Sequence, residues 1–432
     1  MSKSDYSIKK YFLINFFKLI NEQNIDYCVI HGYEALPLNY FGHDLDILIN
    51  YSDLSRIKSI VYKLINKYKL NIFRIEERQQ LFEFVLYDDK LETIILQFIF
   101  LLDYRGVPIF NNPEVFSRTR RFNNITIPSK FHEYVYSFFV RYFWGKEIHK
   151  KYFSNFKKIY NSPDVKKVLK TIFLRKQFAL FDKAIRYNDD IKLIYIRKKM
   201  ILSFFIKGFF REPVLFLKGV FRRYYFGIVN AFKHKGKFIV LVGPDGVGKT
   251  TLAYIITDLL KDYYRGIKYF HFIPKKLIDA RKLDTITQKN KISFDDISNP
   301  KIISLLRIFR NTIRFNLNYF KIIYYIYKQN LIIGDRYFYN YFFYPSSMKY
   351  SASKEIVNFF YKLIPKPKFI FFIEASPEII HNRKKELTKD EILKQLNLIK
   401  NFVKKNNNTY IINNDNNPHD AASTIAKIIL RG

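Results

Sequence analysis

The sequence predicts an α/β protein whose C-terminal part is a parallel sheet flanked by helices. Three observations lead to this prediction. Short apolar, β-branched runs alternate with helical patterns from residue 237 onward, and a glycine-rich turn joins the first run to a helix. The earlier part mixes strand and helix patterns and then becomes helical, aromatic and basic. We therefore expect three parts: an α+β part at 1–115, a helical connector at 116–236 and the α/β part at 237–432.

The size and charge of the chain limit its class and its partners. With 432 residues, the chain is too long for one ordinary core. It has 74 basic and 38 acidic residues, a net charge of +36. Such a charge favours nucleotides, nucleic acid, an anionic membrane surface or a charged glycan. A compositional bias toward Lys, Asn, Ile, Phe and Tyr explains the charge equally well, and both explanations stay open.

Cysteine content and hydropathy limit the kinds of site and the cellular location that we expect. Cys28 is the only cysteine, which excludes an intramolecular disulfide and a cysteine-based metal site. The N-terminus has no signal-peptide layout, and no apolar run approaches about 18 residues. We expect a cytoplasmic protein, possibly in peripheral contact with the inner face of a membrane.

The first part contains two short apolar runs that read as buried strands, at residues 27–30 and 46–49. A helical pattern at 13–20 precedes them, and a glycine turn at Gly32 follows the first run. Together these elements predict a small α+β domain.

Two aspartates, Asp44 and Asp46, stand at alternate positions around the start of the second strand. Alternate residues of a strand share one face, so both carboxylates can bind the same Mg²⁺ ions. With the glycine turn, this arrangement resembles the polymerase-β-type nucleotidyltransferase fold. The alternative is a pair of solvent-facing carboxylates on an edge strand.

A third carboxylate from a later strand normally completes such a site. The candidate strand at residues 93–100 has no acid there, because Gln97, Phe98 and Ile99 occupy the region. Asp103 lies beyond it. A centre with two metal ions is therefore incomplete. We expect this part to bind a nucleotide or a sugar-phosphate, or to be catalytically idle.

The segment from Lys192 to Lys237 is dense in Lys, Arg, Phe and Tyr, and Glu212 is its only acid. One interpretation is a basic, aromatic surface that docks on an anionic membrane. The other, which we favour, is a connector whose aromatic side chains form core against the flanking parts. Pro213 interrupts any long helix, and aromatic residues are abundant throughout the chain.

The α/β part begins with an apolar strand at residues 238–242, a loop at 243–250 and a helical pattern at 251–261. The loop has the G-x-x-x-x-G-K-[ST] spacing of a phosphate-binding loop between a strand and a helix. Its backbone N–H groups and the helix N-terminus favour phosphate, and its lysine and threonine suit nucleotide phosphates and Mg²⁺. ATP and Mg²⁺ are thus the expected cofactors. The residues expected to bind ATP are Gly243, Asp245, Gly246, Gly248, Lys249, Thr250 and Thr251.

A second strand at residues 329–333 leads to Asp335 and Arg336. The carboxyl ends of parallel strands face the ligand crevice, so this pair suits Mg²⁺ and an anionic substrate group. The alternative is a local ion pair at a strand end.

Further elements follow toward the C-terminus. They are a third strand at 368–374, a basic cluster at 383–386, a capping box at 388–391 that opens a helix, a last strand at 410–412 and a closing helix at 421–430. The basic cluster suits a lid over the transferred phosphate, or equally a solvated turn.

These parts, in this order, resemble the thymidylate kinase family of P-loop kinases over nearly 200 residues. The pieces that carry the resemblance are the runs 243–251, 335–337, 371–378, 383–386 and 410–413. This resemblance implies ATP-dependent transfer of the γ-phosphoryl group to an acceptor, normally a nucleoside monophosphate. By resemblance, Asp245 contacts the acceptor's sugar hydroxyl, Arg314 grips its phosphate and Arg383 neutralises the transferred group.

The expected site is therefore as follows. The catalytic residues are Lys249, Asp335, Arg336 and Arg383; the substrate-binding residues are Asp245, Arg314 and Tyr337; the metal-binding residues are Thr250 and Asp335 in the last part and Asp44 and Asp46 in the first.

The sequence departs from thymidylate kinases at two places. Val242 stands where a glutamate is usual, and an aromatic run at 338–344 replaces the segment that shapes the base pocket. The chain is closer to a divergent branch associated with surface-polysaccharide genes. Residues 271–274 resemble a His-x-Arg-Pro element of that branch, with Ile273 in place of the arginine. Three functions stay open: a dTMP-type nucleoside monophosphate kinase, a kinase of a sugar or glycan acceptor, and a nucleotide-gated scaffold with little turnover. A homodimer is possible, and nucleic acid stays open as a partner.

Overall fold

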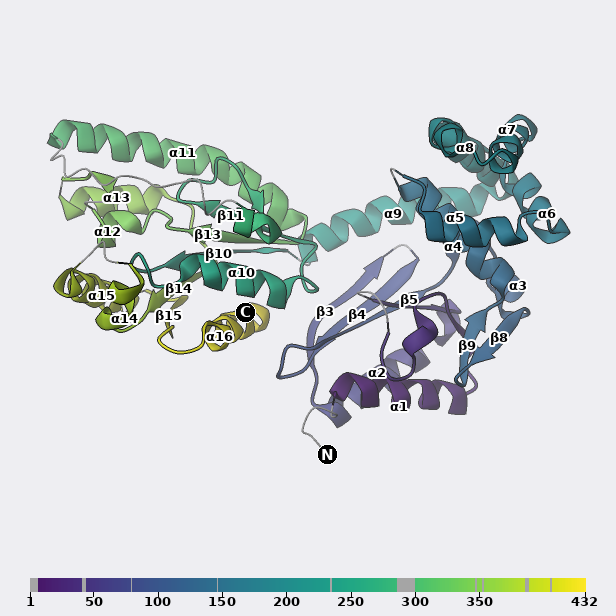
Figure 1. Ribbon diagram of the computed structural model, residues 1–432, viewed down its shortest axis with the longest axis horizontal. Coiled ribbons are helices and arrows are strands. Elements are labelled where there is room, and N and C mark those ends of the chain that lie inside the picture. Colours follow the sequence, from purple (N-terminus) through teal and green to yellow (C-terminus); the bar gives the residue numbers. More distant parts are fainter. Residues whose placement is uncertain are drawn as a thin grey trace. The chain divides into compact units, whose positions relative to one another are not determined.

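A computed structural model describes residues 7–40, 44–78, 80–145, 147–233, 235–285, 300–345, 348–351, 353–384, 388–404 and 406–432. The chain forms two compact units, Met1–Asn230 and Ala231–Gly432 (Figure 1). Residues 116–230 fall in the first unit, whereas the sequence suggested a separate connector. The reason is a shared core, because helical residues from Val135 to Phe204 pack with Cys28, Ile30 and Leu48.

The first unit is built on a five-stranded sheet of order β1-β2-β5-β4-β3. The strands are β1 (Tyr27–Val29), β2 (Leu45–Ile49), β3 (Asn71–Arg78), β4 (Leu81–Tyr87) and β5 (Thr93–Ile99). β2 and β5 are parallel, and the other neighbours are antiparallel. Alternate strand residues such as Leu45 and Ile47 pack in one core with residues of helices α1 (Ile8–Glu22) and α2 (Leu54–Tyr68). The other face of β2 therefore carries Asp46 and Leu48.

Two hairpins and a helical array complete this unit. They are β6 (Leu102–Tyr104), β7 (Val107–Phe110), α3 (Asn112–Phe116), β8 (Thr119–Phe122), β9 (Ile125–Pro128), α4 (Lys130–Trp144), α5 (Lys150–Ile159), α6 (Pro163–Ile172), α7 (Arg175–Arg186), α8 (Asp190–Arg211) and α9 (Pro213–Lys233). As expected, Pro213 separates two helices, since α8 ends just before it. Over the described residues, no helix is both long and apolar enough to cross a bilayer.

The second unit is built on a six-stranded sheet of order β12-β11-β13-β10-β14-β15. The strands are β10 (Lys237–Val242), β11 (Gly266–His271), β12 (Ile278–Asp279), β13 (Asn330–Asp335), β14 (Phe369–Glu374) and β15 (Thr409–Asn413). β12 is antiparallel to β11, and all other neighbours are parallel. The four strands predicted from the sequence are β10, β13, β14 and β15, whereas β11 and β12 were not predicted.

Helices cover both faces of this sheet. They are α10 (Lys249–Leu260), α11 (Lys301–Tyr327), α12 (Asn340–Phe343), α13 (Lys354–Leu363), α14 (Pro377–Arg383), α15 (Lys389–Val403) and α16 (Pro418–Arg431). α11, α12 and α13 share a core with one face of β10, and α10 packs against α16 (Figure 1). This arrangement confirms the predicted α/β class, and it places β10 at the centre with the carboxyl ends of its two neighbours alongside.

Candidate active site

The loop between β10 and α10 has a tight path that requires glycine. Gly246 and Gly248 have φ angles of +90° and +94°, in the left-handed region that other residues rarely adopt. A Cβ atom at Gly248 would lie 2.7 Å from Nδ2 of Asn414, and one at Gly243 would lie 2.6 Å from the carbonyl oxygen of Ile373. The spacing of the glycines therefore follows from both the dihedral angles and the lack of space.

Lys249 begins α10 and is buried inside this loop. Its Nζ donates hydrogen bonds to the carbonyl oxygens of Gly243, at 2.9 Å, and Pro244, at 2.8 Å. Oδ1 of Asp245 lies 3.6 Å from the same nitrogen. Burial lowers the pKa of Lys249, and the charge of Asp335 partly opposes this effect. An ammonium group is therefore held where the loop closes around it.

Asp335 ends β13 next to the phosphate-loop strand, because its Cα pairs with that of Leu241. The carboxylate is buried, and Oδ2 accepts a hydrogen bond of 2.9 Å from the Tyr269 hydroxyl. Within the described part of the chain, Oδ1 has no hydrogen-bond partner. A buried carboxylate oxygen without a partner is costly, so it suits a cation.

Tyr269, on β11, connects the two residues expected to bind metal. Its hydroxyl donates to Oδ2 of Asp335 and lies near the side chain of Thr250. Burial, and then the charge of Asp335, raise the pKa of Tyr269, so the hydroxyl keeps its proton. The structure thus brings Thr250 and Asp335 to the same place.

Arg336 links the end of β13 to the phosphate loop. Its φ angle is +57°, and its backbone N–H donates to the carbonyl oxygen of Leu241 at 3.3 Å. Its guanidinium is paired with Oδ1 of Asp245. Asp245 therefore contacts both Lys249 and Arg336, and three of the predicted residues form one charged group.

Tyr337 lies in the core. Its side chain is 1% exposed, and its hydroxyl donates to the carbonyl oxygen of Pro365 at 2.9 Å. The ring packs against Phe238 and Phe315. In this conformation the ring of Tyr337 packs against the sheet. Because other aromatic side chains enclose the ring, it does not offer a surface to a substrate.

The other predicted residues of this unit have separate positions. Arg314 is half-buried on α11, immediately before Phe315, and Thr251 is exposed on the first turn of α10. Arg383 ends α14, and its Nη1 donates to the carbonyl oxygen of Asn414 at 3.5 Å. Lys385 and Glu386 of the expected lid lie outside the described residues. The capping box is confirmed, since Thr388 and Glu391 exchange both hydrogen bonds.

The sequence did not identify Asn414, which follows β15. Its Nδ2 donates to the carbonyl oxygen of Val247 at 2.7 Å, and its backbone N–H donates to that of Glu374 at 2.8 Å. Asn414 is buried and so fixes the phosphate loop against the neighbouring strand ends. The two residues of the first bond are 167 positions apart, and no short motif signals such a contact.

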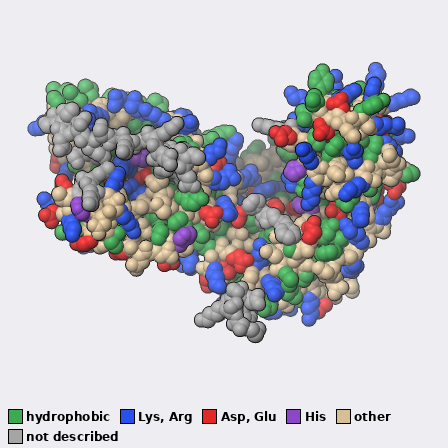
Figure 2. All heavy atoms as spheres, in the orientation of Figure 1, with side chains coloured by type: hydrophobic (Ala, Val, Ile, Leu, Met, Phe, Trp, Pro, Cys, Tyr) green, Lys and Arg blue, Asp and Glu red, His purple; other side chains and the backbone are tan. Residues whose placement is uncertain are grey.

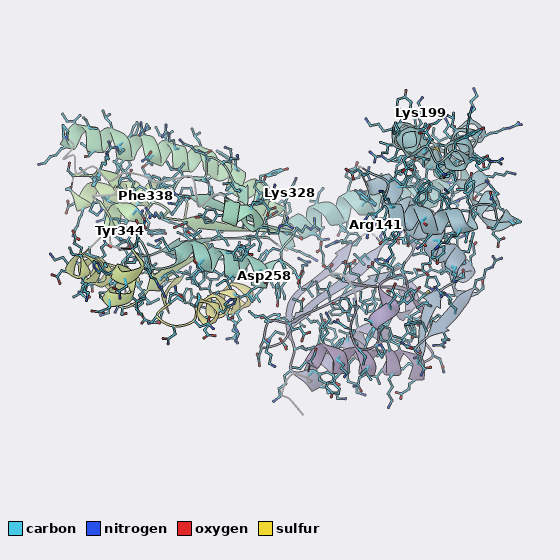
Figure 3. The ribbon with its side chains drawn as sticks, viewed as in Figure 1. Arg141, Lys199, Asp258, Lys328, Phe338 and Tyr344 are labelled. Atoms are coloured by element: carbon cyan, nitrogen blue, oxygen red, sulfur yellow. The ribbon has the colours of Figure 1, made fainter. Side chains whose placement is uncertain are left out.

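The aromatic run at residues 338–344 packs inside the second unit. Five of its residues belong to the core that joins the sheet to the helices: Phe338, Tyr339, Tyr341, Phe343 and Tyr344. Figure 3 labels Phe338 and Tyr344, near α12. The hydroxyl of Tyr341 accepts a hydrogen bond of 2.8 Å from Asn311 of α11. This run is therefore packing and not an open stacking surface.

In the first unit, a polar row crosses the sheet. Register places Asp46 of β2 opposite Gln97 of β5, Gln97 opposite Glu83 of β4, and Glu83 opposite Glu76 of β3. Nε2 of Gln97 donates to Glu83 at 2.8 Å. Arginines on β3 compensate the acids: the shortest pairs are Arg74–Glu83, at 2.7 Å, and Arg78–Glu76, at 3.0 Å. Gln97, one of the three residues that the sequence placed in this region, thus occupies the strand position beside Asp46.

Asp46 itself is paired with His31, whose Nε2 lies 3.1 Å from Oδ2. Burial raises the pKa of Asp46 to about 7; Asp44 adds to the rise and Arg141 of α4 (labelled in Figure 3) opposes it. No group of three or more His, Cys, Asp or Glu side chains in the described ranges is arranged to hold a metal ion. Metal binding by Asp44 and Asp46 stays a prediction.

Comparison with known proteins shows what the second unit is similar to. Residues 241–425 match the family model described as thymidylate kinase. No curated protein matches the chain. Among solved structures, a thymidylate kinase from Ehrlichia chaffeensis is 16% identical, with a TM-score of 0.31, over 45% of this chain and 99% of its own. One from Candida albicans is 18% identical, with a TM-score of 0.30, over 46% of this chain and 92% of its own. The family match, together with the loop and strand geometry, gives the second unit a thymidylate kinase-like domain.

Proposed function

We propose, from the thymidylate kinase-like domain at residues 241–425, that this chain transfers the γ-phosphoryl group of ATP to an acceptor. The observation that supports this most strongly is the end of two adjacent parallel strands. There, Lys249 and Oδ1 of Asp335, which has no hydrogen-bond partner among the described residues, lie beside a loop whose path requires glycine at Gly246 and Gly248. An ammonium group that can bind phosphate and a carboxylate oxygen that can bind a metal ion lie at the same edge of the sheet. Together they suit a nucleotide phosphate with its metal ion.

The residues at this edge fit ATP and Mg²⁺. Oδ1 of Asp335 and the hydroxyl of Thr250 are oxygen ligands of the kind that Mg²⁺ prefers. The loop around Gly246 and Gly248 is the backbone cradle for phosphate. When bound, Mg²⁺ neutralises the charge that develops on the phosphate oxygens.

In this mechanism the protein's residues position groups and stabilise charge. Lys249 exchanges its two loop carbonyl partners for phosphate oxygens, which hydrogen-bond the ammonium more strongly because they are charged. Arg336 and Arg383 supply positive charge toward the transferred group. Asp245, which contacts Lys249 and Arg336, orients the acceptor in this mechanism. Positioning of this kind provides most of the catalysis in phosphoryl transfer.

The first acceptor that we propose is a nucleoside monophosphate of the dTMP type, held by Asp245 and Arg314. A second candidate is a sugar or glycan acceptor. The observation that favours it is the packing of the run at 338–344, whose aromatic side chains are core and leave no stacking surface for a base.

The experiment is a transfer assay with ATP labelled in its terminal phosphate and a panel of nucleoside monophosphates, sugars and lipid-linked glycans. Label in dTMP supports the first acceptor, and label in a sugar or glycan supports the second. Lys249→Ala must abolish transfer in either case. Bound ATP with no labelled product from any acceptor would instead indicate the nucleotide-gated scaffold.

A further inference from the structure

The outward face of α9 is apolar, which is the reverse of an ordinary surface helix. Six side chains recur at spacings of three and four along it and share one face: Val214, Leu217, Phe221, Tyr224, Tyr225 and Ile228. Phe221 is 72% exposed and Tyr224 is 69% exposed. These side chains are not core, so the aromatic-core interpretation of the connector is wrong for this face.

The opposite face of α9 contacts the rest of the first unit. Phe216 packs against Phe205 and Phe209 of α8. Gly219 is buried, and the buried Asn230 donates from Nδ2 to the carbonyl oxygen of Glu77 at 2.8 Å. The helix is therefore held in this rotation by contacts that leave its apolar stripe outward.

The segment that contains the stripe is mainly basic. Between residues 191 and 233 the acidic residue is Glu212, and the basic residues are Lys192, Arg197, Lys198, Lys199, Lys207, Arg211, Lys218, Arg222, Arg223 and Lys233. α9 itself contains no acid, and Lys218 and Arg222 flank one edge of its stripe. Arg222 also lies 3.8 Å from the carboxylate of Glu77 on β3. Figure 2 shows Lys, Arg and hydrophobic side chains, together with a few Asp and Glu, over the neighbouring α7–α8 region.

We propose that the outward face of α9 docks the chain on an anionic lipid surface, with the helix lying in the interface. Aromatic and aliphatic side chains enter the boundary between headgroups and acyl chains, and the flanking lysine and arginine contact lipid phosphates. At 21 residues the helix extends over about 31 Å, enough for several headgroups. A second copy of the chain is a poorer occupant, because pairing the same face would bring like charges together.

The test is flotation of the full chain with two kinds of vesicle. One contains phosphatidylcholine and phosphatidylglycerol in equal parts, and the other contains phosphatidylcholine alone. The chain floats with the anionic vesicles, and added salt weakens this binding because it screens the lysine and arginine contacts. Absence of flotation with anionic vesicles, or equal binding to both kinds, would overturn the proposal.

Two variants with matched controls locate the contact. Phe221→Ser weakens binding about tenfold, whereas Phe359→Ser on α13, which also removes an exposed phenylalanine from a helix, leaves it unchanged. Lys218→Glu weakens binding about tenfold, whereas Lys167→Glu on α6, an equally exposed site, does not.

Sedimentation velocity separates the remaining occupants. If Phe221→Ser dissociates a dimer of the free chain while vesicle binding is unaffected, the face is an interface between two copies of the chain. The lipid proposal is then wrong. Because none of these positions lies in the second unit's site, phosphotransferase activity without lipid is the folding control, and it stays unchanged in Phe221→Ser and Lys218→Glu.

Discussion

Both units have buried carboxylates on a central sheet, but these carboxylates have different partners in the two sheets. In the second unit, Asp335 ends its strand with one oxygen lacking a partner among the described residues, next to the ammonium of Lys249. In the first unit, Glu83 and Glu76 are paired with arginines of β3, and Gln97 stands beside Asp46.

The difference teaches where a ligand is needed. Oδ1 of Asp335 has no hydrogen-bond partner among the described residues, so this oxygen beside the glycine loop has hydrogen-bonding capacity left for a ligand. The charges of Glu83 and Glu76 are instead matched by arginines of β3 within the sheet. We therefore expect changes in the second unit to affect activity most, and changes in the first unit to affect mainly stability.

The largest expected effect is that of Lys249→Ala. Removing the ammonium removes a charge that stabilises the transferred phosphate, and we expect turnover to fall by about 10³-fold. ADP release in the presence of acceptor measures it. Lys261→Ala, at the far end of the same helix and exposed, is the matched control and keeps full activity. Equal activity in the two variants would contradict the role of Lys249.

Asp335→Asn is expected to have the second largest effect on activity. The amide keeps the shape and the contact with Tyr269 but loses the charge that attracts Mg²⁺, so turnover falls by about 10²-fold. A titration of activity against Mg²⁺ then needs more metal for half-maximal rate. Asp258→Asn, an exposed acid on α10, leaves the titration unchanged. An unaltered Mg²⁺ requirement in Asp335→Asn would show that the metal is held elsewhere.

Asn414→Ala tests the support of the phosphate loop. It leaves the carbonyl oxygen of Val247 without its donor, which costs about 1–3 kcal/mol of unfolding free energy. A looser loop also binds nucleotide about tenfold more weakly, since its position is no longer fixed. Calorimetric titration with ATP measures the affinity. The adjacent Asn413→Ala, whose side chain is exposed, is the control, and equal affinities in both variants would rule out this support.

The smallest expected effect is in the first unit. The pKa of Asp46 is about 7 in the folded chain, above its ordinary value, so folding favours the protonated acid. Stability therefore falls as the pH rises from about 4 through about 7. Asp46→Asn removes this loss and is expected to stabilise the unit at high pH by on the order of 1 kcal/mol.

Denaturant unfolding at several pH values measures this effect. The gain from Asp46→Asn shrinks toward zero as the pH falls toward about 4, because Asp46 is then neutral in both states. Asp164→Asn, which removes an exposed acid paired with the exposed Arg118, is the matched control. A gain in Asp46→Asn that is independent of pH would contradict the raised pKa.

Much of the second unit could be predicted from local patterns. The four parallel strands and the phosphate loop depend on short runs of neighbouring residues, and all of them were found where expected. β11 was missed, because its run from Gly266 to His271 mixes polar and apolar residues, and Tyr269 was missed with it. Asn414 was missed because its partner Val247 is distant in the sequence.

The first unit and the roles of single side chains were harder to predict. The sequence indicated that the strand at 93–100 brings no acid to Asp46, but the compensation of Glu83 and Glu76 by arginines depends on cross-strand register. For Tyr337, a motif indicated a substrate contact, whereas tertiary packing turns the ring into the core. Local sequence spacing predicts the helix or strand on which a residue lies. The direction and contacts of its side chain depend on tertiary packing.

The most direct test of the central claim is calorimetric titration of the full chain with a non-hydrolysable ATP analogue and Mg²⁺, in the wild type, in Lys249→Ala and in Asp46→Asn. We predict one binding event that is lost in Lys249→Ala and unchanged in Asp46→Asn. Binding that persists in Lys249→Ala and disappears in Asp46→Asn would contradict the account, because it would place the nucleotide on the sheet of the first unit.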